Sequence, residues 1–248
     1  MAQVDRALAE PSGRHGEIVA KLAVRILSGG YPADMVLPTA EELCLELDVS
    51  RTSLREALRV LEAKGLVEAR QRIGTRVCPR ERWLRLDPDV LRWARACPPD
   101  PEFMQGLLET RWMIEPMAAE LAAKRATARD LMVIEAAFNG MASTLATDLE
   151  ACTQADVEFH IAILRATHNP VIANLATVIG AALKSTFILS NSLSESFERT
   201  LRAHGEVLEG IRMRDPERAG AAMRSLLGIA REDLGPLADP DAAQATGR

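Results

Sequence analysis

The stretch that decides the fold, LPTAEELCLELDVSRTSLREALRVLEAKGLVEARQRIGTRV, spans residues 37–77. It opens with Thr39, followed three positions later by Glu42, which is the spacing of a capping box at a helix N-terminus. Ser50 is placed to cap a second helix, whose leucines and alanines fall on one face, and Gly65 ends that helix. The two short segments that follow flank a turn and predict a β-hairpin.

The residues before this stretch predict one more helix. GEIVAKLAVRILSGGY, residues 16–31, places its apolar side chains close to one helical face and ends at a pair of glycines. Three short helices followed by a hairpin is the order of elements in a winged helix-turn-helix, whose third helix enters the major groove of DNA.

The charge of the chain is unevenly distributed. The 30 Lys and Arg residues are outnumbered by 35 Asp and Glu residues, and the net charge of −5 taken alone argues against binding to nucleic acid. From Arg51 to Arg82, however, nine basic residues face four acidic ones, so this segment carries +5. A basic island in an acidic chain indicates two domains with different functions.

The basic island supplies the candidate DNA contacts. Arg suits bidentate contact with guanine, while Ser and Thr hydroxyls near a helix N-terminus suit phosphate oxygens. A basic residue at the hairpin tip can enter the minor groove, and a glycine there lets the backbone approach DNA closely. The expected contact residues are Ser50, Arg51, Thr52, Ser53, Arg55, Arg72 and Gly74. The alternative is a solvated basic face without a ligand.

The rest of the chain predicts a helical second domain. Residues 102–237 contain about six helical patterns of the lengths found in antiparallel bundles. The expected fold is therefore mainly α, with an N-terminal winged helix-turn-helix and a C-terminal all-α antiparallel helical bundle. The expected parts are a flexible N-terminus (1–13), the DNA-binding domain (14–80), a linker with a short helix (81–101), the helical domain (102–237) and a disordered tail (238–248).

Composition also predicts where the protein works. The four cysteines form no CxxC pair, and no apolar run approaches the ~18 residues that a membrane span needs. The first residues are polar and contain no signal-length apolar core. We therefore expect a cytoplasmic protein without membrane contact or a disulfide framework.

Three residues in the helical half form a candidate metal site. Asp156 and His160 lie four positions apart, which places both on one helical face, together with apolar residues that favour burial. His204 also precedes an apolar stripe. If the two helices face each other, one carboxylate and two imidazoles converge as a donor set for Zn²⁺ or a similar divalent ion. The alternative is structural: Asp156 orients His160, and His204 serves elsewhere.

Arg111 is the candidate anion-binding residue of this domain. It falls in an apolar helical pattern, and an Arg that points into a bundle requires an anionic partner. That partner is either Glu115 on the same helix or the carboxylate of a bound ligand, which a guanidinium grips well.

Residues 37–77 resemble the winged-helix domain of GntR-type bacterial transcription regulators. The second half carries E-x-R at residues 109–111, D-x-x-x-H at 156–160, N-P at 169–170 and H-x-x-x-L-x-x-I-x-x-x-D at 204–215. These motifs resemble the effector domain of the FadR subgroup, the FCD-type domain. The segments WLRLDPDVLRWA and ATHNPVIANLA resemble those of members that repress galactonate utilisation.

The resemblance implies a homodimer that represses transcription from a palindromic operator and is released by a small carboxylate, such as a sugar acid. It implies that Arg51 and Arg55 contact bases or phosphates, assisted by Ser50, Thr52 and Ser53, with Gly74 in the wing. It further implies that Asp156, His160 and His204 are metal ligands and that Arg111 lines the effector cavity.

Two positions depart from the family pattern. Many metal-binding members have another His where this chain has Leu226, so a metal would rely on three protein ligands plus water or an effector carboxylate. A family arginine that often contacts DNA is replaced by Glu41, which predicts a changed operator preference.

Two other functions remain open on the sequence. An open Asp/His/His site could activate water in a metal-dependent enzyme, although the chain shows no nucleophile motif and no glycine-rich phosphate loop. Alternatively, the helical half only dimerises a DNA-binding module. We expect a regulator that is not an enzyme.

Overall fold

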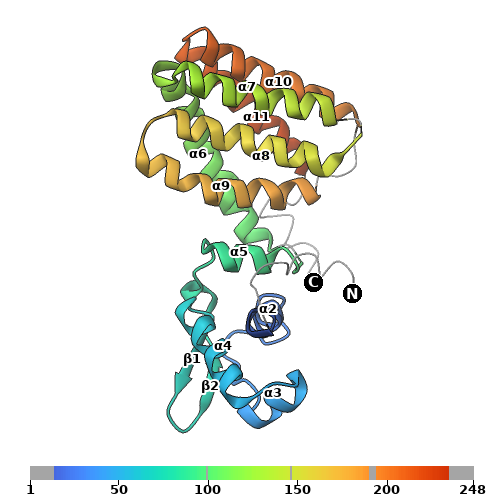
Figure 1. The fold of residues 1–248 in the computed structure, drawn as a ribbon. Coiled ribbons are helices and arrows are strands. Elements are labelled where there is room, and N and C mark those ends of the chain that lie inside the picture. Colours follow the sequence, from blue (N-terminus) through green and yellow to red (C-terminus); the bar gives the residue numbers. More distant parts are fainter. Residues whose placement is uncertain (1–13, 99, 146, 190–193, 235–248) are drawn as a thin grey trace, which may run out of the picture. The chain divides into compact units, whose positions relative to one another are not determined.

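The computed structural model describes residues 14–98, 100–145, 147–189 and 194–234, and these form two compact units that meet in the chain at Asp100. The expected flexible N-terminus (1–13) and disordered tail (238–248) lie outside the described residues. Within the described residues, every helix is too short or too polar to cross a membrane. Figure 1 shows the elements of both units.

The first unit consists of short helices and one β-hairpin. Its elements are α2 (Arg14–Leu27), α3 (Ala40–Leu47), α4 (Arg51–Ala63), β1 (Val67–Arg70), β2 (Gly74–Val77), η1 (Arg80–Arg82) and α5 (Pro88–Ala94). Helices α2 and α3 both pack on α4, and the hairpin follows α4 directly. The winged helix-turn-helix predicted from the sequence is confirmed in this unit.

Local signals begin and end the helices where the sequence predicts. The Thr39 side chain accepts from the Glu42 backbone N–H and the Glu42 carboxylate accepts from the Thr39 N–H, so the capping box is formed. Ser50 Oγ accepts from the Ser53 N–H at 3.1 Å. Gly65 has a φ of +72°, a left-handed conformation that glycine adopts at little cost.

The hairpin is antiparallel, and the loop before α3 extends its pairing. Val67 pairs with Val77, and Arg70 with Gly74. An isolated bridge joins Val36 to Arg76 on the outer side of β2. The wing is therefore held to the loop between α2 and α3 by backbone hydrogen bonds as well as by its own ladder.

The segment expected as a linker forms α5 and contributes to the core of the first unit. Trp83 and Trp93 are buried in the same apolar cluster as Leu22 of α2 and Leu61 of α4. Lys64, at the end of α4, donates to Asp87 at 2.7 Å, next to the start of α5. Aromatic burial and this ion pair attach the segment to the rest of the first unit.

The second unit is made of helices throughout its described residues. They are α6 (Pro101–Arg125), α7 (Ala128–Thr144), α8 (Leu149–Ala166), α9 (Pro170–Leu189), α10 (Ser194–Arg212) and α11 (Pro216–Leu234). Helix α7 packs on α8, α8 on α9 and α10 on α11, while α11 returns to pack on α6. The predicted helical bundle is confirmed.

Small residues allow these helices to pack closely. Helix α6 buries four alanines in the core, and a Cβ placed on Gly210 of α10 would lie 2.7 Å from the backbone nitrogen of Ala219 on α11. Helix α6 contacts both α8 and α10 in this core, and α7 also contacts both of them. This packing brings polar residues from the three helices together.

Candidate nucleic-acid interface and candidate metal centre

Helix α4 presents polar and basic residues outward because its apolar residues face the core. Leu54, Ala57 and Leu61 are buried at helical spacing. Arg51, Thr52 and Arg55, on the other side, are exposed, while Ser53 is partly buried beside the N-cap. The amphipathic pattern thus leaves the first turns of α4 available for a ligand.

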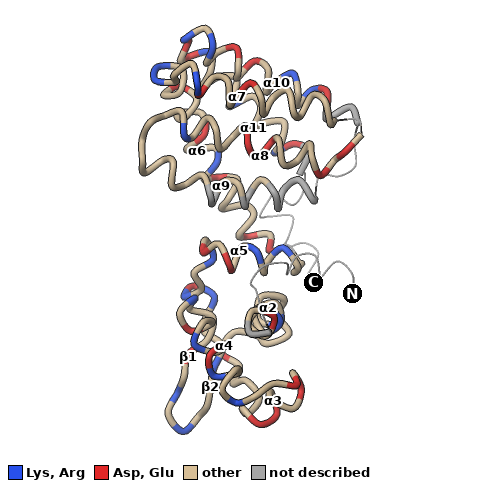
Figure 2. The backbone as a smooth tube through the Cα atoms, in the orientation of Figure 1, with Lys and Arg blue, Asp and Glu red and all other residues tan. Residues whose placement is uncertain are grey.

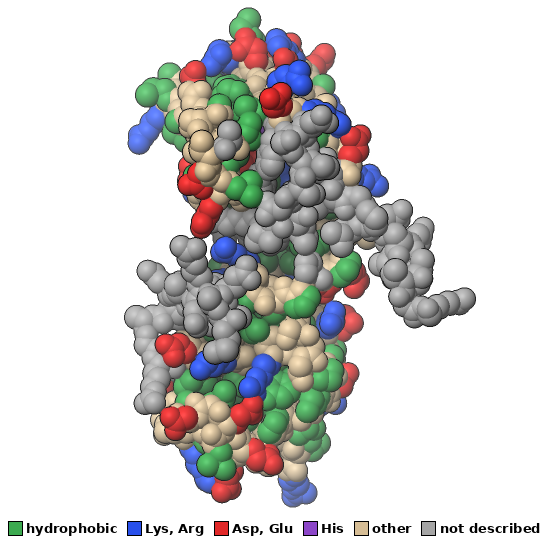
Figure 3. Space-filling model, turned by 90° about the vertical axis from the view of Figure 1, so that its right-hand side faces the viewer, with side chains coloured by type: hydrophobic (Ala, Val, Ile, Leu, Met, Phe, Trp, Pro, Cys, Tyr) green, Lys and Arg blue, Asp and Glu red, His purple; other side chains and the backbone are tan. Residues whose placement is uncertain are grey.

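Basic residues lie along α4 and the hairpin, whereas α3 is acidic (Figure 2). On the face drawn in Figure 3, by contrast, acidic and basic side chains are interspersed over both units. One acidic residue lies close to the basic surface of α4: Glu41 Oε2 is 3.7 Å from Arg51 Nη2, and both side chains are exposed, at 75% and 77%. The acidic side chain at position 41 therefore faces the start of α4.

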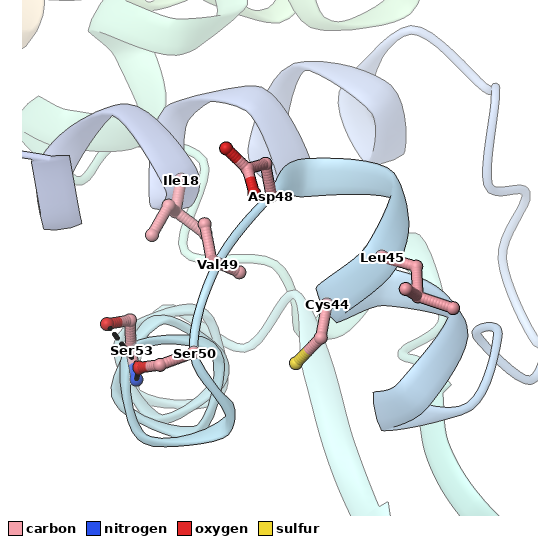
Figure 4. Close-up of a pocket in the computed structure, with 7 residues that line it drawn as sticks. All are labelled: Ile18, Cys44, Leu45, Asp48, Val49, Ser50 and Ser53. Atoms are coloured by element: carbon pink, nitrogen blue, oxygen red, sulfur yellow. Dashed lines mark hydrogen bonds between the residues drawn. The ribbon is translucent and has the colours of Figure 1, made fainter.

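A pocket of about 540 Å³ lies beside the N-terminus of α4 (Figure 4). Ile18 of α2 and Cys44 and Leu45 of α3 supply its apolar lining, and Ser50 and Ser53 supply hydroxyl groups. The Ser50 and Ser53 hydroxyls lie 3.0 Å apart, so they are hydrogen-bonded to each other. The serines predicted as DNA contacts are therefore already part of the cap of α4.

The wing carries a basic cluster organised by one carboxylate. Glu68 Oε1 accepts from Arg70 Nε at 2.7 Å, and Glu68 Oε2 accepts from Arg82 Nη1 at 2.6 Å. These bonds hold the pKa of Glu68 below its usual range. Arg72, at the tip, is exposed with a φ of +66°, and Gly74 has a φ of +105°. Sequence reasoning identified the tip but missed Glu68, whose contact with Arg82 depends on how the chain folds back after β2.

The second candidate site lies inside the helical unit. Helix α6 contributes Arg111 and Glu115, α8 contributes Asp156 and His160, and α10 contributes His204. All five side chains are buried, with exposed fractions of 1–5%. The i,i+4 spacing places each pair on one helical face, as the sequence predicts for the pair on α8.

The three predicted metal ligands are close together. His204 Nε2 lies 2.8 Å from Asp156 Oδ1, and His160 Nε2 lies 3.7 Å from the same oxygen. One ligand atom from each of the three residues lies within 4.8 Å of the others. Phe159, fully buried, packs edge-on against both imidazoles and gives the cluster an apolar wall.

The hydrogens on the imidazoles can be placed from their neighbours. His204 Nδ1 lies 2.8 Å from the Thr200 carbonyl oxygen, so Nδ1 carries a hydrogen and donates it. In the neutral ring, Nε2 of His204 then carries a lone pair, which faces Asp156. Although only 2.8 Å separates these atoms, they are not aligned as a hydrogen bond. Two acceptor atoms at this distance repel each other unless a proton or a cation lies between them.

The charges of the cluster also favour a bound cation. Burial raises the pKa of Asp156, but its contact with His204 and the nearby basic groups outweigh burial and bring that pKa to about 2. Burial likewise raises the pKa of Glu115, and Arg111 and His160 bring it to about 2. In the neutral form that binds a metal, the two imidazoles add no charge, and two ionised carboxylates against one guanidinium would then leave a negative charge in a buried site, which is costly without a cation. The residues therefore fit a divalent metal with imidazole and carboxylate ligands.

Arg111 is paired with Glu115 in this structure. Arg111 Nε donates to Glu115 Oε1 at 2.6 Å, and Arg111 Nη2 donates to Glu115 Oε2 at 3.4 Å. Of the two partners predicted for Arg111, Glu115 is the one present. The effector role of Arg111 remains a prediction.

Sequence reasoning missed part of this site. It named Glu115 as a partner of Arg111 but not of His160, and it did not identify Phe159 or Thr200. Leu226, the position where the family resemblance suggested a fourth ligand, is a buried core residue.

Comparison with known proteins places both units in one group of regulators. The family described as "Bacterial regulatory proteins, gntR family" matches residues 14–77, and the FCD domain matches residues 106–228. The galactonate operon transcriptional repressor of Escherichia coli is 36% identical over 88% of this chain and 95% of its own. The uncharacterized HTH-type transcriptional regulator YieP of Escherichia coli is 32% identical over 84% of this chain and 89% of its own.

The fold is shared with solved structures. A protein described as controlling the Listeria monocytogenes agr system superposes with a TM-score of 0.66 over 90% of this chain and 98% of its own, at 20% sequence identity. At that identity the likeness concerns the fold alone.

Proposed function

The chain belongs to the GntR family of bacterial regulatory proteins, in the group with an FCD domain, and from this premise we propose that it is a transcriptional repressor released from DNA by a small carboxylate. The repressor assignment is supported by the galactonate operon repressor, which aligns over nearly the whole of both chains. We propose a sugar acid of the galactonate type as the effector class.

The DNA-binding half of the proposal is carried by the exposed basic surface of α4. Arg51, Thr52 and Arg55 stand where a recognition helix meets base edges and phosphates, with Ser50 and Ser53 at its N-terminus. The wing adds Arg72 and Gly74, which together with Ser50, Arg51, Thr52, Ser53 and Arg55 form the proposed contact set. A homodimer with two such helices would bind the two halves of a palindromic operator.

The test is a double substitution of Arg51 and Arg55 with Ala. Binding is measured by fluorescence anisotropy on a duplex selected from a random library with the wild-type protein. Because each subunit then binds two fewer phosphates or bases, affinity should fall at least tenfold, and the slope of log K against log salt should decrease by roughly 0.9 for each phosphate that is no longer bound. The control is the double substitution of Arg129 and Arg165 with Ala, which removes the same charge from exposed positions in the helical unit. Equal affinity of both variants would refute the assignment.

The ligand-binding half is supported by the buried cluster of the helical unit. We propose that Asp156, His160 and His204 hold a divalent metal such as Zn²⁺ and that Arg111 grips the effector carboxylate. A metal bound there would supply positive charge for the ligand's oxygens. Arg111 offers a planar set of donors, of which Nε and Nη2 donate to Glu115 in this structure.

Release from DNA requires that the two sites be coupled. A coupling free energy of about 1–3 kcal/mol changes operator affinity roughly 5- to 150-fold. We propose that the ligand reorders helices of the FCD domain so that the two DNA-binding units of the dimer no longer fit both half-sites. Thermal-shift measurements with D-galactonate and other sugar acids, with and without a chelator, test ligand and metal together. No shift with any acid would favour a helical domain that serves dimerisation alone.

We also propose that the helical unit binds its ligand without converting it. This is supported by the relatives, which are named as transcription regulators, and the buried ligand set lies among apolar residues. Incubation of D-galactonate with the metal-loaded protein should leave its proton NMR spectrum unchanged over hours, whereas appearance of a product would establish an enzyme.

A further inference from the structure

Glu115 is shared between two side chains that the proposed function assigns to different tasks. One oxygen, Oε1, accepts from Arg111 Nε at 2.6 Å, and the other, Oε2, lies 2.6 Å from His160 Nδ1. All three side chains are 1–4% exposed. A single buried carboxylate therefore lies between the proposed acid-binding group and a proposed metal ligand.

The contact with His160 determines which ring nitrogen of this histidine can bind a metal. Two bare acceptor atoms 2.6 Å apart would repel each other, so this distance favours a hydrogen on Nδ1, although the contact is not aligned as a hydrogen bond. With the hydrogen on Nδ1, the lone pair of the neutral ring is on Nε2, which lies 3.7 Å from Asp156 Oδ1. His204 has the same arrangement, with the Thr200 carbonyl in place of Glu115.

We propose that Glu115 is a positioning residue that links Arg111 to His160: it holds the Nδ1–H of His160 so that Nε2 faces the other ligands, and Arg111 holds Glu115 in that place. The proposal rests on the proposed function, in which His160 binds a metal and Arg111 binds an acid. A carboxylate that partners a ligand imidazole raises the basicity of the ring and fixes its tautomer.

The shared carboxylate has a regulatory consequence. When an acid accepts hydrogen bonds from Arg111, the positive charge of Arg111 neutralises the Glu115 carboxylate less completely. Glu115 then accepts a stronger hydrogen bond from the Nδ1–H of His160. The Nε2 of His160 then becomes a better ligand. Acid and metal should therefore strengthen each other's binding, by the same factor in both directions.

The first experiment needs no acid. Co²⁺ is titrated into metal-free protein and followed by its visible absorption, for the wild type and for Glu115→Gln, which keeps the shape but removes the charge. Affinity should fall roughly 10- to 100-fold. The control is Glu120→Gln, one turn and a half along the same helix, where the carboxylate pairs with Arg224 instead. An unchanged Co²⁺ affinity in Glu115→Gln would overturn the proposal.

A second variant covers the case in which Glu115→Gln does not fold, because it leaves Arg111 without its ion pair. The double variant Arg111→Met with Glu115→Met replaces the pair by apolar side chains of similar volume, a change that buried pairs often tolerate. In metal-free protein, the ¹⁵N shifts of His160 should report the Nδ1–H tautomer for the wild type and a mixture of tautomers for the double variant. The same tautomer in both would contradict the role of Glu115 even if no metal binds.

The third measurement tests the linkage. D-Galactonate should raise the Co²⁺ affinity of the wild type several-fold and have no effect on that of Glu115→Gln. If D-galactonate binds but leaves the Co²⁺ affinity of the wild type unchanged, the link through Glu115 is refuted. If it does not bind at all, the proposed effector class is wrong, and the Co²⁺ and tautomer measurements alone decide the positioning role.

Discussion

Removing the negative charge of Glu41 should strengthen DNA binding. Glu41 lies in the first turn of α3, and its carboxylate is 3.7 Å from the guanidinium of Arg51 at the start of α4. If Arg51 contacts DNA as proposed, Glu41 would compete with DNA for Arg51 in the free protein, and in a complex it would lie close to phosphates. The substitution Glu41→Gln keeps the side-chain size and removes both effects.

The size of the effect follows from distance and exposure. Two unit charges 3.7 Å apart interact by about 1 kcal/mol in a water-like dielectric. Exposed ion pairs of this kind are worth about 0–1 kcal/mol when measured. A homodimer contains the pair twice, so the gain should be up to about 2 kcal/mol, which is up to roughly a 30-fold higher affinity. If Arg51 gains a phosphate, the salt slope should also steepen by roughly 0.9 per subunit.

Fluorescence anisotropy on the selected duplex and on a scrambled one, at several salt concentrations, measures both quantities. Glu150→Gln is the matched control because it makes the same charge change at an exposed position in the helical unit. An increase on both duplexes would show that Glu41 restrains general DNA affinity. An increase on the scrambled duplex alone would show that it contributes to selectivity. If Glu41→Gln and Glu150→Gln agree within twofold throughout, the reasoning is refuted.

Three further substitutions test the fold that supports the sites. Gly65→Ala should destabilise the protein by about 1–3 kcal/mol more than Gly29→Ala in urea unfolding, since both have positive φ but only at Gly65 would the new Cβ lie 2.2 Å from a carbonyl oxygen. The Lys64 ammonium lowers the pKa of Asp89 from 3.8, so the stability it adds is present above that pH and is lost as pH falls through the lowered pKa. Lys64→Met should therefore reduce the melting temperature at pH 7 and have less effect below about pH 4. Thr127→Ala removes the capping box of α7 and should cost about 1 kcal/mol by urea unfolding, and no change would contradict the cap.

The features that the sequence predicted well depend on neighbours within four positions along the chain. The caps at Thr39 and Ser50 and the positive φ at Gly65 are set by local hydrogen bonding and backbone sterics. The same holds for the pair Asp156 and His160, whose common helical face follows from spacing. Such signals are readable without knowing which helices pack together.

The features that the sequence missed depend on which elements meet. Glu115 reaches His160 because α6 packs on α8, and Glu68 gathers arginines because β1 pairs with β2 and η1 follows. In the sequence, Glu115 is one acid among many on amphipathic helices. Its spacing from Arg111 predicted a local ion pair, and this is half of what the structure shows.

The charge balance of the buried cluster connects the metal and the effector. Glu115 and Asp156 are ionised and Arg111 compensates one of them, so with neutral histidines the cluster carries one negative charge. In that state it would repel a carboxylate, whatever donors Arg111 offers. With a divalent cation at Asp156, His160 and His204, the cluster would carry one positive charge, and a monocarboxylate would bring it to neutrality. The effector response of the proposed repressor should therefore depend on metal, and chelation should abolish the effect of D-galactonate on DNA binding while leaving DNA binding itself unchanged.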